Sequence, residues 1–284
     1  MTAETIRLWP DGPPFVIEGV GDEVAYPAPA GLPAGTTFLR NISDPTLTIY
    51  PAQGEPNGLG VIVVPGGGWT IHAWEHEGLD AARWLSGEGF TAFLLKYRVQ
   101  ASGDDQAEFE ARMAAMDGML AAPRTAAQLP CAIADLISTD AYLQARDAAA
   151  DDGRRAIAVA RAEAERFGVN PGAIGMLGFS AGAFLAVDVA LDPRADPLAF
   201  VGAIYGGETR GAAVPLDAPP LFAVVAGDDL LRKIVEGVHH DWSEADRPSE
   251  LHVFARGGHG FGMIHQGSPS DRWTDLFVDW VESR

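Results

Sequence analysis

From residue 61 onward the chain alternates short apolar runs with stretches of helical periodicity, and this alternation constrains its fold more than any other feature. The inner runs are continuously apolar, as strands of a mostly parallel sheet are when helices cover both faces. The pattern indicates an α/β fold with a doubly wound, mostly parallel sheet. The predicted strands are 36–42, 46–50, 61–64, 90–95, 173–177, 199–204, 221–226 and 250–255, and the predicted helices are 76–87, one ending near 167, 181–191, one around 230–238 and one from 271.

Two segments lie outside this alternation. Residues 1–35 are dense in proline and glycine, which predicts an irregular arm ahead of a single α/β domain over 36–284. Residues 101–150 are rich in alanine and acidic side chains and carry methionines at 113, 116 and 119. This helical insertion could be a cap over a pocket, with the methionines as its apolar lining, or a peripheral helix pair. The sequence leaves the two interpretations equal.

The charge balance narrows the choice of partners. The chain has 39 acidic and 20 basic residues, a formal net charge of −19, and this field repels phosphate backbones and anionic lipid headgroups. We therefore expect a small neutral substrate and neither nucleic acid nor membrane as a partner. The single cysteine, Cys131, excludes an intrachain disulfide and a multi-cysteine metal site. Residues 1–11 show no signal-peptide pattern, and we expect a soluble cytoplasmic protein.

The strongest chemical signal is Gly178-Phe179-Ser180-Ala181-Gly182, which follows a predicted strand and opens a predicted helix. In a nucleophile elbow the turn holds a serine in a strained backbone conformation with its hydroxyl projecting. The residues two positions away must be nearly bare to let strand and helix approach, and glycines at 178 and 182 meet that need. The alternative is an ordinary glycine-rich turn with an N-capping serine.

A second signal is the glycine run Pro65-Gly66-Gly67-Gly68-Trp69, directly after the strand 61–64. At the carboxyl end of a parallel strand such a run exposes backbone N–H groups where ligands bind. Acyl transfer needs donors aimed at a developing oxyanion, and we expect the amides of Gly67, Gly68 and Ala181 to supply them. A flexible loop is the alternative, and the place of the run ahead of the serine turn disfavours it.

Histidine is the expected general base, and only His259 sits in a glycine-flanked loop at the carboxyl end of a strand. That loop, residues 256–262, follows the last predicted strand and lies downstream of the serine, as expected when a nucleophile elbow is followed in the chain by an acid and then a histidine. Of the other histidines, His239 and His240 fall on a polar helix, and His252 falls within a strand. The remaining three could line the site: His72, His76 and His265. The spacing of His72 and His76 lacks a convincing third ligand, so no metal is expected.

The acid that orients the histidine should follow the strand 221–226, where Gly227-Asp228-Asp229 ends the apolar run. Its role is to hold the histidine tautomer and to stabilise the imidazolium. One aspartate is expected to take this role, and the other to cap a loop or helix. Position alone does not decide between Asp228 and Asp229.

Together these features resemble the α/β-hydrolase superfamily, and more narrowly its bacterial acetyl-xylan esterase or acetylesterase branch. The resemblance spans about residues 59–280. It implies a serine carboxylesterase for short acyl esters, such as acetylated sugars, with Ser180 as nucleophile, His259 as base, Asp229 as acid and no cofactor. The motifs that carry it are 64–69, Trp74-Glu75-His76-Glu77-Gly78, Leu95-Lys96-Tyr97-Arg98, 178–182 and 257–262. The elbow continues with Ala183-Phe184, where glycine and histidine are usual in that branch, so the substrate stays open.

Bulky aromatic side chains near the two glycine motifs predict a small acyl pocket. Trp69 and Phe179, with Phe184, are expected to border it, and plain core packing is the alternative. Two competing functions remain: a peptidase or other acyl hydrolase of the same fold, and a non-catalytic binding protein on a hydrolase scaffold. Turnover of p-nitrophenyl acetate would separate the enzyme from the binding protein. The sequence says nothing of the oligomeric state.

Overall fold

The computed structural model describes residues 3–27, 32–33, 35–121 and 139–284. Its centre is an eight-stranded sheet in the order β1-β4-β7-β5-β8-β9-β10-β11, in which β4 runs antiparallel to both of its neighbours and the strands from β7 to β11 are parallel. This sheet confirms the predicted fold class. The strands are β1 (Glu4–Arg7), β4 (Thr46–Tyr50), β5 (Gly60–Val64), β7 (Thr91–Lys96), β8 (Ile174–Phe179), β9 (Val201–Ile204), β10 (Leu221–Ala226) and β11 (Ser249–Phe254).

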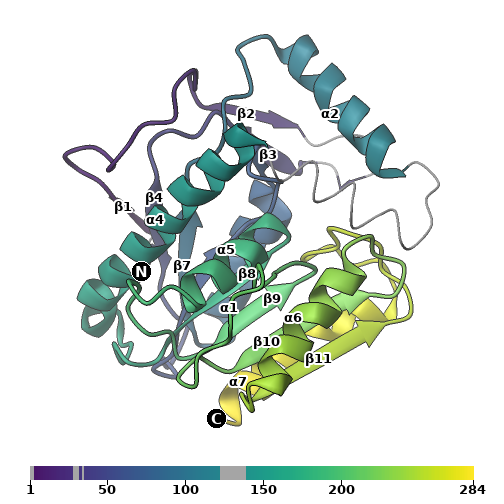
Figure 1. Ribbon diagram of the computed structural model, residues 1–284. Helices are drawn as coiled ribbons and strands as arrows, with labels where there is room; N and C mark the ends of the chain where they lie inside the picture. The colour runs from purple at the N-terminus through teal and green to yellow at the C-terminus, as the bar shows by residue number, and fades with distance from the viewer. Residues whose placement is uncertain (1–2, 28–31, 34, 122–138) are drawn as a thin grey trace.

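Helices cover both faces of the sheet (Figure 1). One face carries α4 (Asp140–Glu163), α5 (Ala181–Ala190) and α6 (Arg232–Glu244). The other carries α1 (Asp80–Gly87) and α7 (Trp273–Glu282), which meet where the ring of Trp84 contacts those of Trp273 and Phe277. Because both faces are covered, β5, β8, β9 and β10 are buried along their whole length. Burial on both faces explains why these strands read as unbroken apolar runs.

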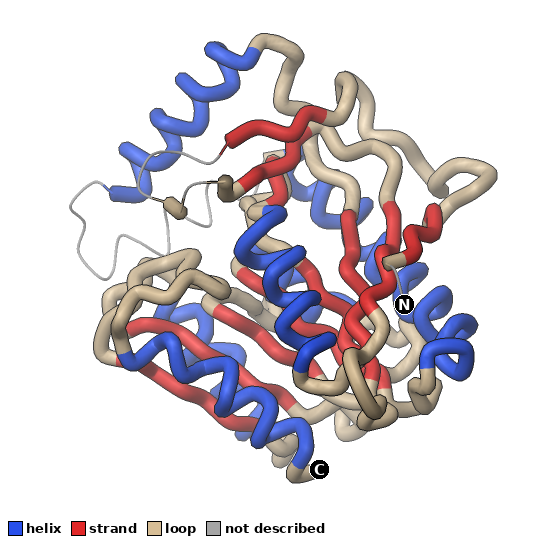
Figure 2. Tube along the Cα trace, turned by 180° about the vertical axis from the view of Figure 1, so that it is seen from behind, coloured by secondary structure: helices blue, strands red, loops and turns tan. Residues whose placement is uncertain are grey.

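A second, three-stranded sheet lies beyond the upper end of the large one (Figures 1 and 2). It has the order β2-β3-β6, with β2 (Val24–Pro27), β3 (Thr37–Arg40) and β6 (Ile71–His72), and α2 (Gln106–Ala121) packs on it. A small apolar cluster of its own holds this unit together, with Met113 packed against it: Tyr26, Phe38, Ile71, Ala73 and Phe109. The side chains of the other two methionines of the predicted stripe lie outside the described residues.

The predicted irregular arm is wrong for two segments, because β1 and β2 both lie within residues 1–35. β1 pairs with β4 and β2 pairs with β3, so each finds its hydrogen-bond partners beyond the local sequence. A window of sequence that contains only one of two pairing strands carries no sign of the pairing. Residues 8–23, between β1 and β2, contain neither helix nor strand, as their proline and glycine content predicts.

The predicted insertion also ends earlier than residue 150. α4 begins at Asp140, and its buried residues include Ala145, Ala148 and Ala149, so the last part of the segment belongs to the core of the α/β domain. The excursion proper therefore begins at residue 101 and includes α2. Pro123, Pro130 and Cys131 of the segment lie outside the described residues.

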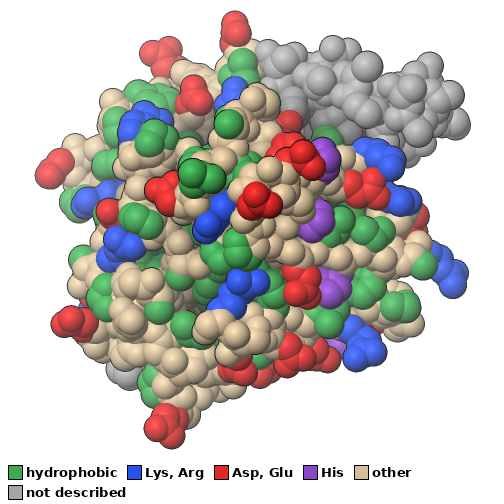
Figure 3. All heavy atoms as spheres, turned by 60° about the horizontal axis from the view of Figure 1, so that its bottom comes forward, with side chains coloured by type: hydrophobic (Ala, Val, Ile, Leu, Met, Phe, Trp, Pro, Cys, Tyr) green, Lys and Arg blue, Asp and Glu red, His purple; other side chains and the backbone are tan. Residues whose placement is uncertain are grey.

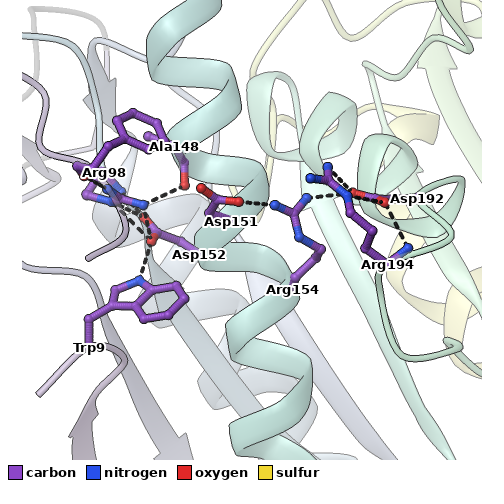
Figure 4. A network of polar contacts seen from close by, with 9 residues as sticks. Trp9, Arg98, Ala148, Asp151, Asp152, Arg154, Asp192 and Arg194 are labelled. Carbon is purple, nitrogen blue, oxygen red and sulfur yellow. Dashed lines mark hydrogen bonds and ion pairs between the residues drawn. The ribbon is translucent and has the colours of Figure 1, made fainter. Parts of the chain in front are cut away.

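A buried ion pair joins α4 to the strand end from which the excursion departs (Figure 4). Arg98 and Asp152 have side chains that are 2% and 0% exposed, and the guanidinium Nη2 lies 2.8 Å from the carboxylate Oδ1. The indole N–H of Trp9 donates to the same carboxylate at 2.8 Å, and Arg98 also donates to the carbonyls of Phe15 and Ala148. One charged pair thus connects the N-terminal arm, the end of β7 and the middle of α4.

Among the described residues, no helix combines the length and apolar character that crossing a membrane requires. On the face drawn in Figure 3, acidic and basic side chains are interspersed with apolar ones, and histidines lie close to acidic side chains. That face therefore carries no basic patch of the kind that binds nucleic acid.

Candidate active site

Ser180 lies at the turn between β8 and α5 with φ 47° and ψ −117°, a conformation that non-glycine residues rarely adopt. Its side chain makes no capping hydrogen bond to α5, so the alternative of an N-capping serine is excluded. A Cβ at Gly178 would lie 2.1 Å from the carbonyl oxygen of Gly182, and one at Gly182 would lie 2.1 Å from that of Val64. Only bare residues allow strand and helix to approach this closely.

The hydroxyl of Ser180 faces the imidazole of His259, with 2.9 Å between Oγ and Nε2. On its other side the ring donates from Nδ1 to the carboxylate of Asp229, at 2.9 Å to Oδ2 and 3.1 Å to Oδ1. The three residues follow β8, β11 and β10, which are parallel and so end at one edge of the sheet. Residues 79 positions apart in the chain therefore meet at that edge.

The two adjacent aspartates occupy different environments. Asp229 is fully buried at its side chain, and its Oδ1 also accepts the backbone N–H of Leu231 at 2.7 Å. Asp228 points to the loop that carries the histidine, where its Oδ1 accepts the backbone N–H groups of Gly257 at 3.1 Å and Gly258 at 2.9 Å. One aspartate thus contacts the imidazole, and the other holds the backbone of the loop.

The environment of His259 favours its charged form. Burial acts against the charge, but the hydrogen bond to Asp229 and the negative charges of Asp229 and Glu77 outweigh it, and the pKa of His259 is raised from its ordinary value of 6.5. The side chain is 29% exposed, so a ligand can reach it. A ring that holds a proton more readily than usual is suited to accept one from the serine hydroxyl.

The glycine run forms the loop between β5 and β6. Gly67 has φ 128° and Gly68 has φ 58°, which turn the backbone in a way that other residues resist. Within the described part of the chain, the amides of Gly67 and Gly68 have no hydrogen-bond acceptor. Ala181 is the first residue of α5, so its amide has no partner within the helix. These three N–H groups are therefore the candidate donors to an oxyanion.

Aromatic rings pack beside this loop. Trp69 packs edge-on against Tyr142 and Phe184, with ring centroids 5.0 and 5.8 Å apart, and the guanidinium of Arg146 lies 5.3 Å from its ring centroid. Tyr142 and Arg146 come from α4 and had no sequence signal, because a helix period does not show what its face meets. Phe179 has a different place, since its buried ring contacts Trp273 and Tyr205 within the core.

The other histidines named for the site do not join Ser180 and His259. His72 is completely buried against the ring of Tyr97, and burial, followed by the charge of Lys96, lowers its pKa to about 3, which keeps it neutral. His265 has a side chain that is 89% exposed. Among the described residues there is no cluster of three or more histidine, cysteine or acidic side chains that could hold a metal ion.

The structure adds a buried carboxylate that sequence reasoning assigned no role. Glu77 is 2% exposed and lies on the π-helix 74–79, within a motif that carried the resemblance. Its Oε2 accepts the backbone N–H of Gly66 at 2.8 Å, and its Oε1 accepts the hydroxyl of Tyr205 at 2.6 Å. The sequence signal for Glu77 was its place in the motif Trp74-Glu75-His76-Glu77-Gly78. Only the fold shows that Glu77 lies beneath the glycine run.

An eight-stranded sheet of this order, with serine, acid and histidine following β8, β10 and β11, defines the α/β-hydrolase fold. Solved structures agree. The acetyl ester-xyloside bifunctional hydrolase of Caldicellulosiruptor lactoaceticus superposes with a TM-score of 0.63 at 22% identity, over 99% of this chain and 96% of that one. An esterase of Pyrobaculum calidifontis gives a TM-score of 0.58 at 15% identity, over 85% of this chain and 81% of that one.

At the level of sequence, no protein-family model matches the chain. An acetylxylan esterase of Xylanibacter ruminicola is 22% identical over 264 residues, which cover 81% of this chain and 46% of that protein. The chain thus spans about half the length of this curated relative. The match confirms the resemblance to acetyl-xylan esterases that the motifs indicated.

Proposed function

We propose that the protein is a serine carboxylesterase in which Ser180 attacks the carbonyl carbon of a short acyl ester. The observation that carries the proposal is the continuous chain of hydrogen bonds from the Ser180 hydroxyl through His259 to Asp229. The spacing of 2.9 Å between Oγ and Nε2 lies within the range for direct proton transfer. A binding protein would have no use for a strained serine aligned with a histidine and a buried acid.

In this mechanism His259 accepts the proton of the Ser180 hydroxyl as the Oγ–C bond forms. The negative charge on the substrate oxygen is stabilised by the open amides of Gly67, Gly68 and Ala181. The protonated histidine then gives its proton to the leaving alcohol as the ester C–O bond breaks. Water, deprotonated by the same histidine, hydrolyses the acyl-enzyme and restores the serine.

We further propose acetyl-type esters as substrates, acetylated sugars among them. The aromatic rings of Trp69, Tyr142 and Phe184 are packed against one another beside the glycine run, which limits the room for an acyl chain. The names of two similar proteins, an acetylxylan esterase and an acetyl ester-xyloside hydrolase, support the same class. A screen of acetylated sugars against simple esters would identify the alcohol half.

The segment that starts at residue 101 is proposed to border the alcohol side of the site. Just before it, the backbone N–H of Gln100 donates to the carbonyl of Trp69 at 2.8 Å, and the side-chain amide donates to Thr70 at 2.7 Å. The excursion therefore starts beside the glycine-run loop. Met113 lies on α2 and packs against the small apolar cluster, so Met113→Gln tests the segment when thermal stability and kinetics are measured together across alcohols of different size. A changed KM or alcohol preference with little loss of stability would support this proposal, and a large loss of stability with unchanged alcohol selectivity would make the segment structural.

The test of the enzyme class is labelling and turnover. The purified protein should hydrolyse p-nitrophenyl acetate and react with a fluorophosphonate probe at Ser180. Ser180→Ala should abolish labelling and lower kcat by several orders of magnitude, because the triad acts as a unit. Ser243→Ala is a matched control, since Ser243 lies on α6 and its hydroxyl meets that of Ser249 at 3.3 Å. Undiminished labelling of Ser180→Ala would refute the mechanism.

A further inference from the structure

Glu77 contacts two of the loops that form the proposed site. Its carboxylate accepts the N–H of Gly66 from the glycine-run loop and the hydroxyl of Tyr205 from the segment after β9. A Cβ at Gly66 would lie 2.7 Å from Glu77 Oε2 and 2.9 Å from the Cβ of Ser180. The carboxylate and the nucleophile thus flank the same glycine, and Glu77 lies directly behind the reacting centre.

Tyr205 extends this contact to the histidine loop. Its hydroxyl accepts the backbone N–H of Gly262 at 3.0 Å while donating to Glu77. Its ring packs edge-on against His259 and Phe261, with centroids 5.0 and 4.7 Å apart. The two hydrogen bonds fix the orientation of the hydroxyl, because it donates to the carboxylate and accepts from the loop. A hydrogen bond at Glu77 therefore helps to determine where the His259 ring lies.

The partners of Glu77 differ from those of Asp152 and Asp188. Asp152 and Asp188 each face an arginine, which compensates for the loss of water around the carboxylate. Glu77 has neutral donors, and the basic side chain beside it is His76, whose Nε2 lies 3.8 Å from Oε1. A buried carboxylate without a strong cationic partner costs stability, and such groups gather at functional sites.

We propose that Glu77 is a positioning residue for catalysis, which aligns the oxyanion loop through Gly66 and the His259 loop through Tyr205, and whose charge stabilises the imidazolium. This inference rests on the proposed esterase function. It explains why a carboxylate that cannot touch substrate lies behind Ser180. Because Glu77 acts through backbone and ring contacts, its removal should affect turnover more than substrate binding.

The sharpest variant is Glu77→Gln, which keeps size and can still accept the N–H of Gly66 but carries no charge. Its NH₂ group would face the hydroxyl of Tyr205 and leave that hydroxyl proton without its acceptor. The matched control is Glu75→Gln, on the same π-helix, where the partly exposed carboxylate pairs with Arg83. Misplacing reacting groups by about 1 Å costs roughly 100-fold in rate. We expect a fall in kcat of about this size in Glu77→Gln, little change in KM, and wild-type behaviour in the control.

The pH dependence separates positioning from a general structural role. The titratable groups that face His259 are Asp229 from the loop after β10, Glu77 from the π-helix and Tyr205 from the segment after β9. Glu77 faces Tyr205, Tyr97 and His76. Removing the negative charge of Glu77 lowers the pKa of His259, so the acidic limb of kcat/KM should move to lower pH in Glu77→Gln. Loss of packing alone would not move it.

Two further measurements keep the outcome decisive. NMR titration of the His259 ring in Glu77→Gln and Glu75→Gln reads the charge effect without any substrate. If Glu77→Gln does not fold, Tyr205→Phe removes the linking hydroxyl and keeps the ring, and kcat should fall at unchanged KM. A folded Glu77→Gln with wild-type kcat, acidic limb and His259 titration would overturn this inference alone. A wild-type protein without turnover or labelling would instead refute the proposed function.

Discussion

Replacement of Asp229 by asparagine tests the proposed triad most directly, because shape is nearly kept while the proton on His259 is forced to move. The Asp229 side chain is fully buried, with Oδ1 held at 2.7 Å by the N–H of Leu231 and Oδ2 at 2.9 Å from His259 Nδ1. An asparagine would keep its carbonyl oxygen on Leu231 and turn its NH₂ group toward Nδ1. That nitrogen must then lose its proton and act as an acceptor.

The proton would move to Nε2, the nitrogen that faces the Ser180 hydroxyl, and the ring could no longer accept the serine proton. A loss of about 10⁴-fold in kcat is expected for this change, or about 5 kcal/mol of transition-state stabilisation. The assay is p-nitrophenyl acetate hydrolysis at saturating substrate, with the fluorophosphonate reaction rate as a second measure. Both should fall together, since both need an activated serine.

Asp228→Asn is the matched control. Its side chain uses one oxygen to accept two backbone N–H groups of the histidine loop, and an amide oxygen can accept both. We expect kcat to change by less than about tenfold, because the substitution only replaces charge-assisted hydrogen bonds with neutral ones. A crippled Asp228→Asn beside an active Asp229→Asn would refute the assignment of the acid and shift the register of the triad by one residue.

Three other measurements test the remaining arguments. The raised pKa of His259 places the midpoint of the acidic limb of kcat/KM above pH 6.5, because the ring must be neutral to act as base; a midpoint below 6.5 would contradict this. Activity should fall progressively from acetate to octanoate esters, and Phe184→Ala should reduce the difference by making room beside Trp69; faster octanoate turnover by the wild type would refute a small acyl pocket. Arg98→Met should lower the free energy of unfolding by about 3–5 kcal/mol in urea titrations, since it leaves Asp152 buried without its cation; a loss below 1 kcal/mol would mean that Asp152 is protonated or hydrated.

The sequence by itself determined the fold class and the serine turn of the proposed site. Strands buried on both faces, such as β5 and β8, must be apolar throughout, so their positions can be read without knowledge of their neighbours. The sequence also predicts the serine turn, because strand and helix approach so closely that only glycine fits at 178 and 182. Both are local constraints, and each is satisfied within a short stretch of chain.

The tertiary structure decided what depends on distant partners. β1 and β2 exist because β4 and β3 pair with them, and α4 begins at residue 140 because its alanine face meets the sheet. The same holds for the site. Position in the sequence did not decide which of Asp228 and Asp229 contacts the histidine. The path of the histidine loop places Asp229 at the imidazole and Asp228 at the backbone of the loop.

Glu77 shows most clearly what the sequence cannot predict, because a glutamate on a short helical stretch is ordinarily solvated. Here the fold closes over it and brings Gly66 and Tyr205 to its two oxygens from elsewhere in the chain. A hydrogen bond requires its partners within about 3 Å, and sequence separation carries no information about that distance. Local geometry can thus be read from residue order, whereas contacts between distant segments are decided by how the whole chain packs.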